Sequence, residues 1–427
     1  MPTYAGDRNV IIGYEAGAAT TSATDNVVIG ERALSSDSVS DYSVIIGAEA
    51  ASASTASSQT IAIGQKALST PTNISSNIAI GTQAMEGSAS TPAIGDRNIA
   101  IGNFALQDVN DTAINDNIAI GINAMGDSRN SQTQYNVAIG SNASRGLINE
   151  RYNVTIGHRA GQDSPGALGQ IIIGGYLDSG TPASSYAGDG SVLIGYRAAE
   201  NVPSTLNVRG NIIIGELAGS GINGLSASPA PASEFNVIIG DQACNTHDDI
   251  NNCVIIGTTA DVAGTTVNNA IAIGDRAITG RGGVSVGQGT TTATNGVAVG
   301  QVATTSGTNA VAVGQGSTAV ANSVAIGVGA SNGTSSVAIG DSASSGNDGV
   351  AVGQNASGGI GGIALGKAAS SAGGLAINLT GGTMTQTPGP AQISIEGVTT
   401  GPAGPLVTYL EAYINGILYY IPLHDVP

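Results

Sequence analysis

A short apolar pattern recurs along almost the whole chain. A branched apolar residue, a second apolar residue and then Ile or Val precede a Gly, and the stretch from Asn98 to Met125 carries this pattern twice, each time as NIAIG. We count 22 main copies between residues 9 and 366. Ser, Thr, Asn, Asp and Gly fill the intervals, and these residues favour turns. The pattern therefore predicts a repeat protein in which each unit contributes one short strand.

Both faces of each predicted strand are apolar. Counting back from the Gly, the first and third positions are Ile, Val or Leu, and the middle position is frequently Ala, as in Ala100 and Ala119. A strand with one face in water alternates apolar and polar residues, so these strands should be covered on both sides. Stacked coils would place Ala in one column and Ile or Val in another. A single thin coil covers one face, so we expect partner chains over the other and poor stability for an isolated monomer.

The glycines of the pattern set the period and divide the chain. We take Gly30, Gly102, Gly121, Gly327 and Gly340 as repeat-defining residues, because Gly bends the backbone where other residues do not. Consecutive repeat glycines among the 22 copies are 17 to 25 residues apart in the first part of the chain and 13 or 14 apart in the second. We therefore expect a loop-bearing, long-coil unit over residues 1–280, a short-coil unit over 281–378 and a separate segment over 379–427.

The coil itself should be all-β. A 13-residue unit has no room for a helix and a strand, so strands and turns alone must build it. A second short strand is expected around the Ala that follows each repeat Gly by three residues, at Ala33, Ala67, Ala84, Ala105, Ala124, Ala143 and Ala277. Coils stacked at about 4.8 Å would make a rod roughly 100 Å long.

The C-terminal segment follows a different pattern. VTYLEAYINGILYYIPL reads as two strands joined at Asn415 and Gly416, a strong hairpin signal because both residues tolerate positive φ. We expect a small β module. It could cap the open end of the rod, set the register of three chains, or dock onto another protein.

Composition and charge narrow the function classes. The chain has 64 Gly, 2 Phe and no Trp, so its core must be narrow. A net charge of −17 with 13 Lys and Arg speaks against nucleic-acid binding. The N-terminus has no basic and apolar run typical of a secretion signal, and no apolar run reaches the roughly 20 residues of a membrane helix. We therefore expect no nucleic-acid partner and no membrane insertion.

The sequence contains no recognisable catalytic motif. We assign no catalytic, cofactor-binding or metal-ligating residue and expect a protein that is not an enzyme. Cys244 and Cys253 are either two semi-buried thiols or a local disulfide. The Asp-rich turn THDDINN could hold calcium. GGIALGK, from Gly361 to Lys367, has the spacing of a phosphate-binding loop but continues with Ala368, and it is one more copy of the repeat.

Two long insertions are candidates for recognition. They begin at Gly174 and Glu216 and carry Tyr176, Tyr186 and Phe235 among small polar residues. Aromatic side chains present flat faces that suit sugar rings. These loops either pack on the rod or contact a receptor.

The repeat also resembles a known family. NSVAIGVGASNGTSSVAIGDSASS, from Asn322 to Ser345, resembles the head repeats of trimeric autotransporter adhesins, and longer units such as NVVIGERALSSDS are similar to repeats of bacteriophage tail fibres. The resemblance covers roughly residues 9–378. It implies a left-handed parallel β-roll that is intertwined or packed as a homotrimeric rod.

The resemblance also implies a function. The secretion signal, heptad stalk and membrane barrel of an autotransporter are not found in this sequence, which favours the phage version. We expect a phage virion fibre, assembled in the host cytoplasm and extracellular when mature. Its partners would be two further copies, other virion proteins and a host-surface glycan or protein. The alternative is a bacterial surface adhesin or self-assembling extracellular filament, and a fibre-borne depolymerase is a third possibility.

Overall fold

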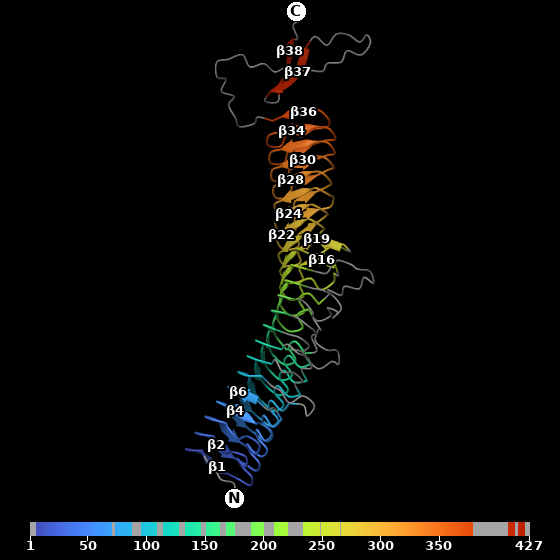
Figure 1. The fold of residues 1–427 in the computed structure, drawn as a ribbon. Helices are drawn as coiled ribbons and strands as arrows, with labels where there is room; N and C mark the ends of the chain where they lie inside the picture. The colour runs from blue at the N-terminus through green and yellow to red at the C-terminus, as the bar shows by residue number, and fades with distance from the viewer. Residues whose placement is uncertain are drawn as a thin grey trace, which may run out of the picture.

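The chain folds as a long, gently curved β rod (Figure 1). The computed structural model describes residues 6–70, 73–87, 95–108, 114–127, 133–146, 151–162, 168–175, 189–199, 209–220, 234–247, 249–264 and 266–378, and the strands 409–414 and 417–422. These residues contain strands and turns and no helix. The all-β expectation is therefore confirmed for the described part of the chain.

One parallel sheet runs the length of the rod. Each strand pairs in register with the corresponding strand of the next coil, for example Ile99 with Ile118 and Ile118 with Val137. Its 23 strands are β1 (Val10–Ile12), β2 (Val27–Ile29), β3 (Val44–Ile46), β5 (Ile61–Ile63), β7 (Ile78–Ile80), β8 (Ile99–Ile101), β9 (Ile118–Ile120), β10 (Val137–Ile139), β11 (Val154–Ile156), β12 (Ile171–Ile173), β13 (Val192–Ile194), β14 (Ile212–Ile214), β15 (Val237–Ile239), β17 (Val254–Ile256), β20 (Ile271–Ile273), β22 (Val284–Val286), β24 (Val297–Val299), β26 (Val311–Val313), β28 (Val324–Ile326), β30 (Val337–Ile339), β32 (Val350–Val352), β34 (Ile363–Leu365) and β36 (Leu375–Ile377).

A second parallel sheet accompanies the short coils. It consists of β18 (Asp261–Val262), β21 (Ile278–Thr279), β23 (Thr291–Thr292), β25 (Thr304–Thr305), β27 (Thr318–Ala319), β29 (Ser331–Asn332), β31 (Ser344–Ser345), β33 (Ser357–Gly358) and β35 (Ser370–Ser371). Two further parallel pairs join β4 (Ala56–Ser58) to β6 (Asn73–Ser75) and β16 (Asp249–Asn251) to β19 (Thr266–Asn268). The strands β37 (Tyr409–Ile414) and β38 (Ile417–Pro422) pair antiparallel, as the hairpin pattern predicts. The turn residues Asn415 and Gly416 lie outside the described residues.

The prediction of a second strand in the long coils is wrong at most positions. The alanines three residues after the repeat glycines, such as Ala33, lie in a turn rather than a strand. Arg32 and Leu34, on either side of Ala33, both have a left-handed backbone, with φ of 51° and 50°. Alternating left-handed residues are incompatible with an extended strand. In the short coils a two-residue strand does form, but it begins one residue after the Ala, as β21 does after Ala277.

The middle residue of each strand of the main sheet faces the interior. Ala62, Ala79, Ala100, Ala119 and Ala138 are all 0% exposed and stack on one another from coil to coil. The residues on either side of them point outward. The column expected from the sequence therefore exists, and the structure identifies the Ala column as the inner one.

Two buried side chains of a coil fill its core, and their sizes compensate for each other. In several long coils a small middle strand residue accompanies a large buried residue four positions after the repeat Gly, and the reverse pairing also occurs. Gly17 shows the contact directly, because a Cβ there would lie 3.2 Å from Cδ1 of Ile11. Buried pairs that follow this rule are Ala62 with Leu68, Ala79 with Met85, Ala100 with Leu106, Ala119 with Met125, Ile45 with Ala51, Leu193 with Ala199 and Ile238 with Cys244. The exchange keeps the interior close to one volume per coil.

A ladder of buried asparagines closes the same interior beside the strands. The backbone N–H of Asn117 donates to Oδ1 of Asn98, and that of Asn136 donates to Oδ1 of Asn117, each at 3.0 Å. Nδ2 of Asn117 in turn donates to the carbonyl of Thr133 at 3.0 Å. Each amide thus satisfies backbone groups of the neighbouring coil that are shielded from water.

The five repeat-defining glycines occupy the closest approach between coils. Their φ values are 138° at Gly30 and Gly102, 137° at Gly121, and 136° at Gly327 and Gly340. A Cβ at Gly121 would lie 2.4 Å from the carbonyl oxygen of the next repeat glycine, Gly140. Both the backbone conformation and the space therefore require glycine.

We expect Gly327→Ala to destabilise the rod. The new Cβ would lie 2.2 Å from the carbonyl oxygen of Gly340, at a backbone conformation that costs about 1–3 kcal/mol for other residues. The matched control is Gly329→Asn in the same coil, where φ is 61° and the nearest atom to a Cβ is 3.9 Å away. Chemical denaturation should show a lower midpoint for Gly327→Ala and an almost unchanged one for Gly329→Asn. Equal midpoints for the two variants would contradict this view of the repeat glycine.

Candidate functional site

The outer face of the main sheet is a continuous apolar surface. The first and third residue of each strand point away from the core, and most of them are partly buried by their neighbours in the same column. Several remain more exposed, among them Ile101 at 37%, Ile326 at 38% and Ile339 at 37%. We call this surface the outer Ile/Val face, and it comprises the first and third residues of the 23 strands of the main sheet. No described side chain forms a layer over it.

The outer Ile/Val face is large enough to hold chains together. A strip three residues wide and 23 strands long measures about 10 Å by 110 Å, because strands rise about 3.3 Å per residue and lie about 4.8 Å apart. This area of about 1,000 Å² exceeds the ~800 Å² that each partner buries in a standard interface. The length of the array thus converts a narrow apolar stripe into an interface-sized surface.

Ion pairs connect successive coils at the edges of the rod. Nε and Nη2 of Arg97 donate to the two carboxylate oxygens of Asp116 at 2.7 and 2.9 Å. These hydrogen bonds from Arg97 lower the pKa of Asp116 below its ordinary value. The small stabilisation they give is therefore present at neutral pH and is lost on acidification. Arg8 with Asp25 and Arg145 with Asp127 form similar pairs.

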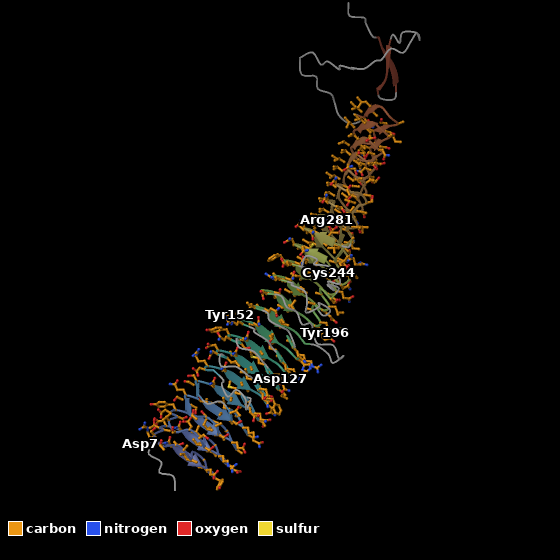
Figure 2. The ribbon with its side chains drawn as sticks, turned by 45° about the vertical axis from the view of Figure 1, so that its right-hand side comes forward. Asp7, Asp127, Tyr152, Tyr196, Cys244 and Arg281 are labelled. Carbon is orange, nitrogen blue, oxygen red and sulfur yellow. The ribbon has the colours of Figure 1, made fainter. Side chains whose placement is uncertain are left out.

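Exposed aromatic side chains share one edge of the rod. Tyr135 and Tyr152 stand one coil apart with ring centroids at 5.1 Å and an interplanar angle of 1°. The predicted residue Phe235 occupies the same position of its own coil and is 61% exposed. The other two predicted contact residues, Tyr176 and Tyr186, lie outside the described residues. Tyr196 lies on the opposite side of the rod from Tyr152 (Figure 2).

The sequence interpretation missed Tyr135 and Tyr152. Their signal is present, because YNVAIG and YNVTIG place a Tyr two residues before the strand in consecutive repeats. Equal positions in consecutive coils lie one strand spacing apart, so the rings must meet.

The Asp-rich turn forms hydrogen bonds with Asp261 of the next coil. Nδ1 of His247 lies 3.0 Å from Oδ1 of Asp261, and the Thr246 hydroxyl hydrogen-bonds to Oδ2 of Asp261. Among the described residues, no three His, Cys, Asp or Glu side chains gather in a way that could hold a metal ion.

Both cysteines are buried, and neither forms a disulfide. Cys244 fills the small position opposite Ile238, and Cys253 takes the place of an Asn in the ladder, where its backbone N–H donates to Oδ1 of Asn236 at 2.9 Å. Burial raises the pKa of the Cys253 thiol. Of the two alternatives from the sequence, the structure supports a pair of thiols.

Comparisons with known proteins add no family. No family model matches the chain, and no curated protein matches it significantly. The part of the chain that the structure describes has no helix long and apolar enough to cross a membrane. The candidate site consists of the outer Ile/Val face and of the exposed aromatic residues Tyr135, Tyr152 and Phe235 at one edge of the rod.

We expect both cysteines to resist thiol reagents in the folded protein. Both side chains are 0% exposed, and the raised pKa of Cys253 keeps its thiol protonated at pH values near the usual cysteine pKa. A colorimetric thiol assay at pH 8 should report almost no reactive thiol in native protein and two per chain in denaturant. Rapid labelling of the native protein, or a pair that reacts only after reduction, would contradict the structure.

Proposed function

We propose that this chain is a structural fibre protein of a bacteriophage virion, a tail fibre or another appendage, that assembles as a homotrimer and attaches to the host surface. The observation that carries the proposal is the outer Ile/Val face, which extends from β1 to β36 without a covering layer among the described residues. A long apolar stripe on a narrow coil is stable in water when equivalent stripes of further copies pack against it.

The rod geometry suits attachment at a distance. Three parallel rods would form a stiff spacer, and recognition residues on its edges or ends would then act three at a time, so that weak contacts add up to tight binding. The C-terminal segment would contact other virion proteins or close the end of the rod. The phage assignment itself rests on the likeness of units such as NVVIGERALSSDS to phage-fibre repeats.

A bacterial surface adhesin or extracellular filament would use the same apolar face. This alternative differs from the virion fibre in where the protein is found and in how the assembly grows. Growth end to end would give filaments of unlimited length in electron micrographs, whereas a virion fibre has one length.

The trimer is tested by charging the outer Ile/Val face. We expect the wild-type protein to sediment at three times its chain mass. Ile326→Asp combined with Ile339→Asp buries two unpaired carboxylates in the proposed interface and should shift the protein toward monomer and aggregate. Val328→Asp is the control in the same coil, because Val328 is 54% exposed at the turn after the strand. A folded wild-type monomer, or an equal effect of the control, would contradict the proposed interface.

The virion assignment is tested in purified particles. We expect peptides of this chain in mass spectra of density-purified phage particles, and antibody labelling of a fibrous appendage in electron micrographs. Lysate from uninfected host cells is the control. Absence from particles, with the protein present on bacterial surfaces, would replace this proposal with the adhesin.

A further inference from the structure

One column of the rod carries several of the exposed aromatic rings among the described residues. Tyr135, Tyr152 and Phe235 each stand two residues before their strands, β10, β11 and β15, and are 47%, 61% and 61% exposed. The column is continuous, because the backbone N–H at this position donates to the carbonyl of the preceding coil, for example Tyr152 to Gln134 at 3.2 Å. The residue at each of these positions has a left-handed φ, such as 63° at Tyr152, which turns its side chain outward at the edge.

Side chains are missing from the column between Tyr152 and Phe235. The three intervening coils have Gly169, Gly190 and Gly210 at this position. No described atom other than those of adjacent residues lies within 4 Å of where a Cβ would stand on Gly169 or Gly190. On Gly210 a Cβ would meet Cδ1 of Phe235 at 2.8 Å, so the Phe235 ring lies over Gly210 and faces the gap. We call this gap the aromatic notch, with Tyr152 and Phe235 as walls and the three glycines as floor.

Tyr152 presents a flat ring face toward the gap, and the Phe235 ring lies above the other end of it. Because Tyr135 stacks on one face of Tyr152 along the column, the second face of Tyr152 is turned toward Gly169. From Tyr152 to the ring above Gly210 is three coils, or about 14 Å at the ordinary strand spacing. This gap accommodates about two pyranose rings, one stacked on each wall.

Polar groups line the rim beside the floor. The residues that precede the glycines are the apolar Leu168 and the charged Asp189 and Arg209, and all three are exposed. Oδ1 of Asp189 accepts the backbone N–H of Leu168 at 3.0 Å, which fixes the carboxylate beside the notch. A carboxylate and a guanidinium exchange hydrogen bonds readily with sugar hydroxyls.

We propose that the aromatic notch binds a short oligosaccharide of the host surface, with pyranose rings stacked on Tyr152 and Phe235 and hydroxyls bonded to Asp189 and Arg209. This inference rests on the proposed attachment function and specifies its ligand and its place. A ligand with flat apolar ring faces and a rim of hydroxyls matches two aromatic walls and a charged rim. The glycine floor lets that ligand lie against the backbone.

The test uses the full-length assembled protein on an array of oligosaccharides from bacterial O-antigens and capsules, followed by calorimetry with any fragment that binds. Tyr152→Ala removes one wall, and Gly190→Asn fills the floor. Asn is compatible with the backbone there, because Asn252, Asn269 and Asn295 hold the same position at φ of 54°, 56° and 55°. Tyr42→Ala is the matched control, a 63% exposed Tyr of the same column outside the notch.

We expect the wild-type protein and Tyr42→Ala to bind with equal affinity, and Tyr152→Ala and Gly190→Asn each to bind at least about tenfold more weakly, with unchanged sedimentation. Binding that survives both notch variants would overturn the proposal. So would wild-type protein that binds no fragment on the array. If that protein is still a trimer present in virions, the notch fails while the proposed fibre function stands.

Discussion

The close approach of successive coils at the repeat glycine is the constraint on which the rod depends. At Gly102 the position of a Cβ is only 2.4 Å from the carbonyl oxygen of Gly121, and the same contact repeats from coil to coil. With glycine there, each strand hydrogen-bonds to the next in register, and every other position of the coil stacks on its equivalent. Columns of like residues are the direct result.

Each column then has a different physical role. The inner Ala column, with its volume exchange against Leu68, Met85 or Cys244, fills a narrow core at nearly constant volume. The asparagine ladder satisfies backbone groups that water cannot reach. Edge columns place opposite charges or aromatic rings one coil apart. The outer Ile/Val face is the one column pair left without a partner within the chain, and the proposed trimer follows from it.

The strands of the main sheet were predicted well from the sequence, because 22 of the 23 strands are followed directly by a repeat Gly. The prediction failed at Ala33 and its equivalents, where left-handed residues on both sides make a turn that composition alone does not distinguish from a short strand. The aromatic column was missed for a different reason. Tyr135 and Tyr152 are 17 residues apart, and their stacking emerges only when the residues two before each strand are aligned from coil to coil.

The sequence by itself determined that this protein is a repetitive all-β coil with two apolar strand faces and glycine bends at fixed places. Tertiary structure decided which face became the core. Both faces carry apolar residues at every second position, so periodicity cannot rank them, and the choice depends on the space inside a coil. That space admits Ala119 opposite Met125 but not a second layer of branched side chains, and this leaves Ile118 and Ile120 on the outside.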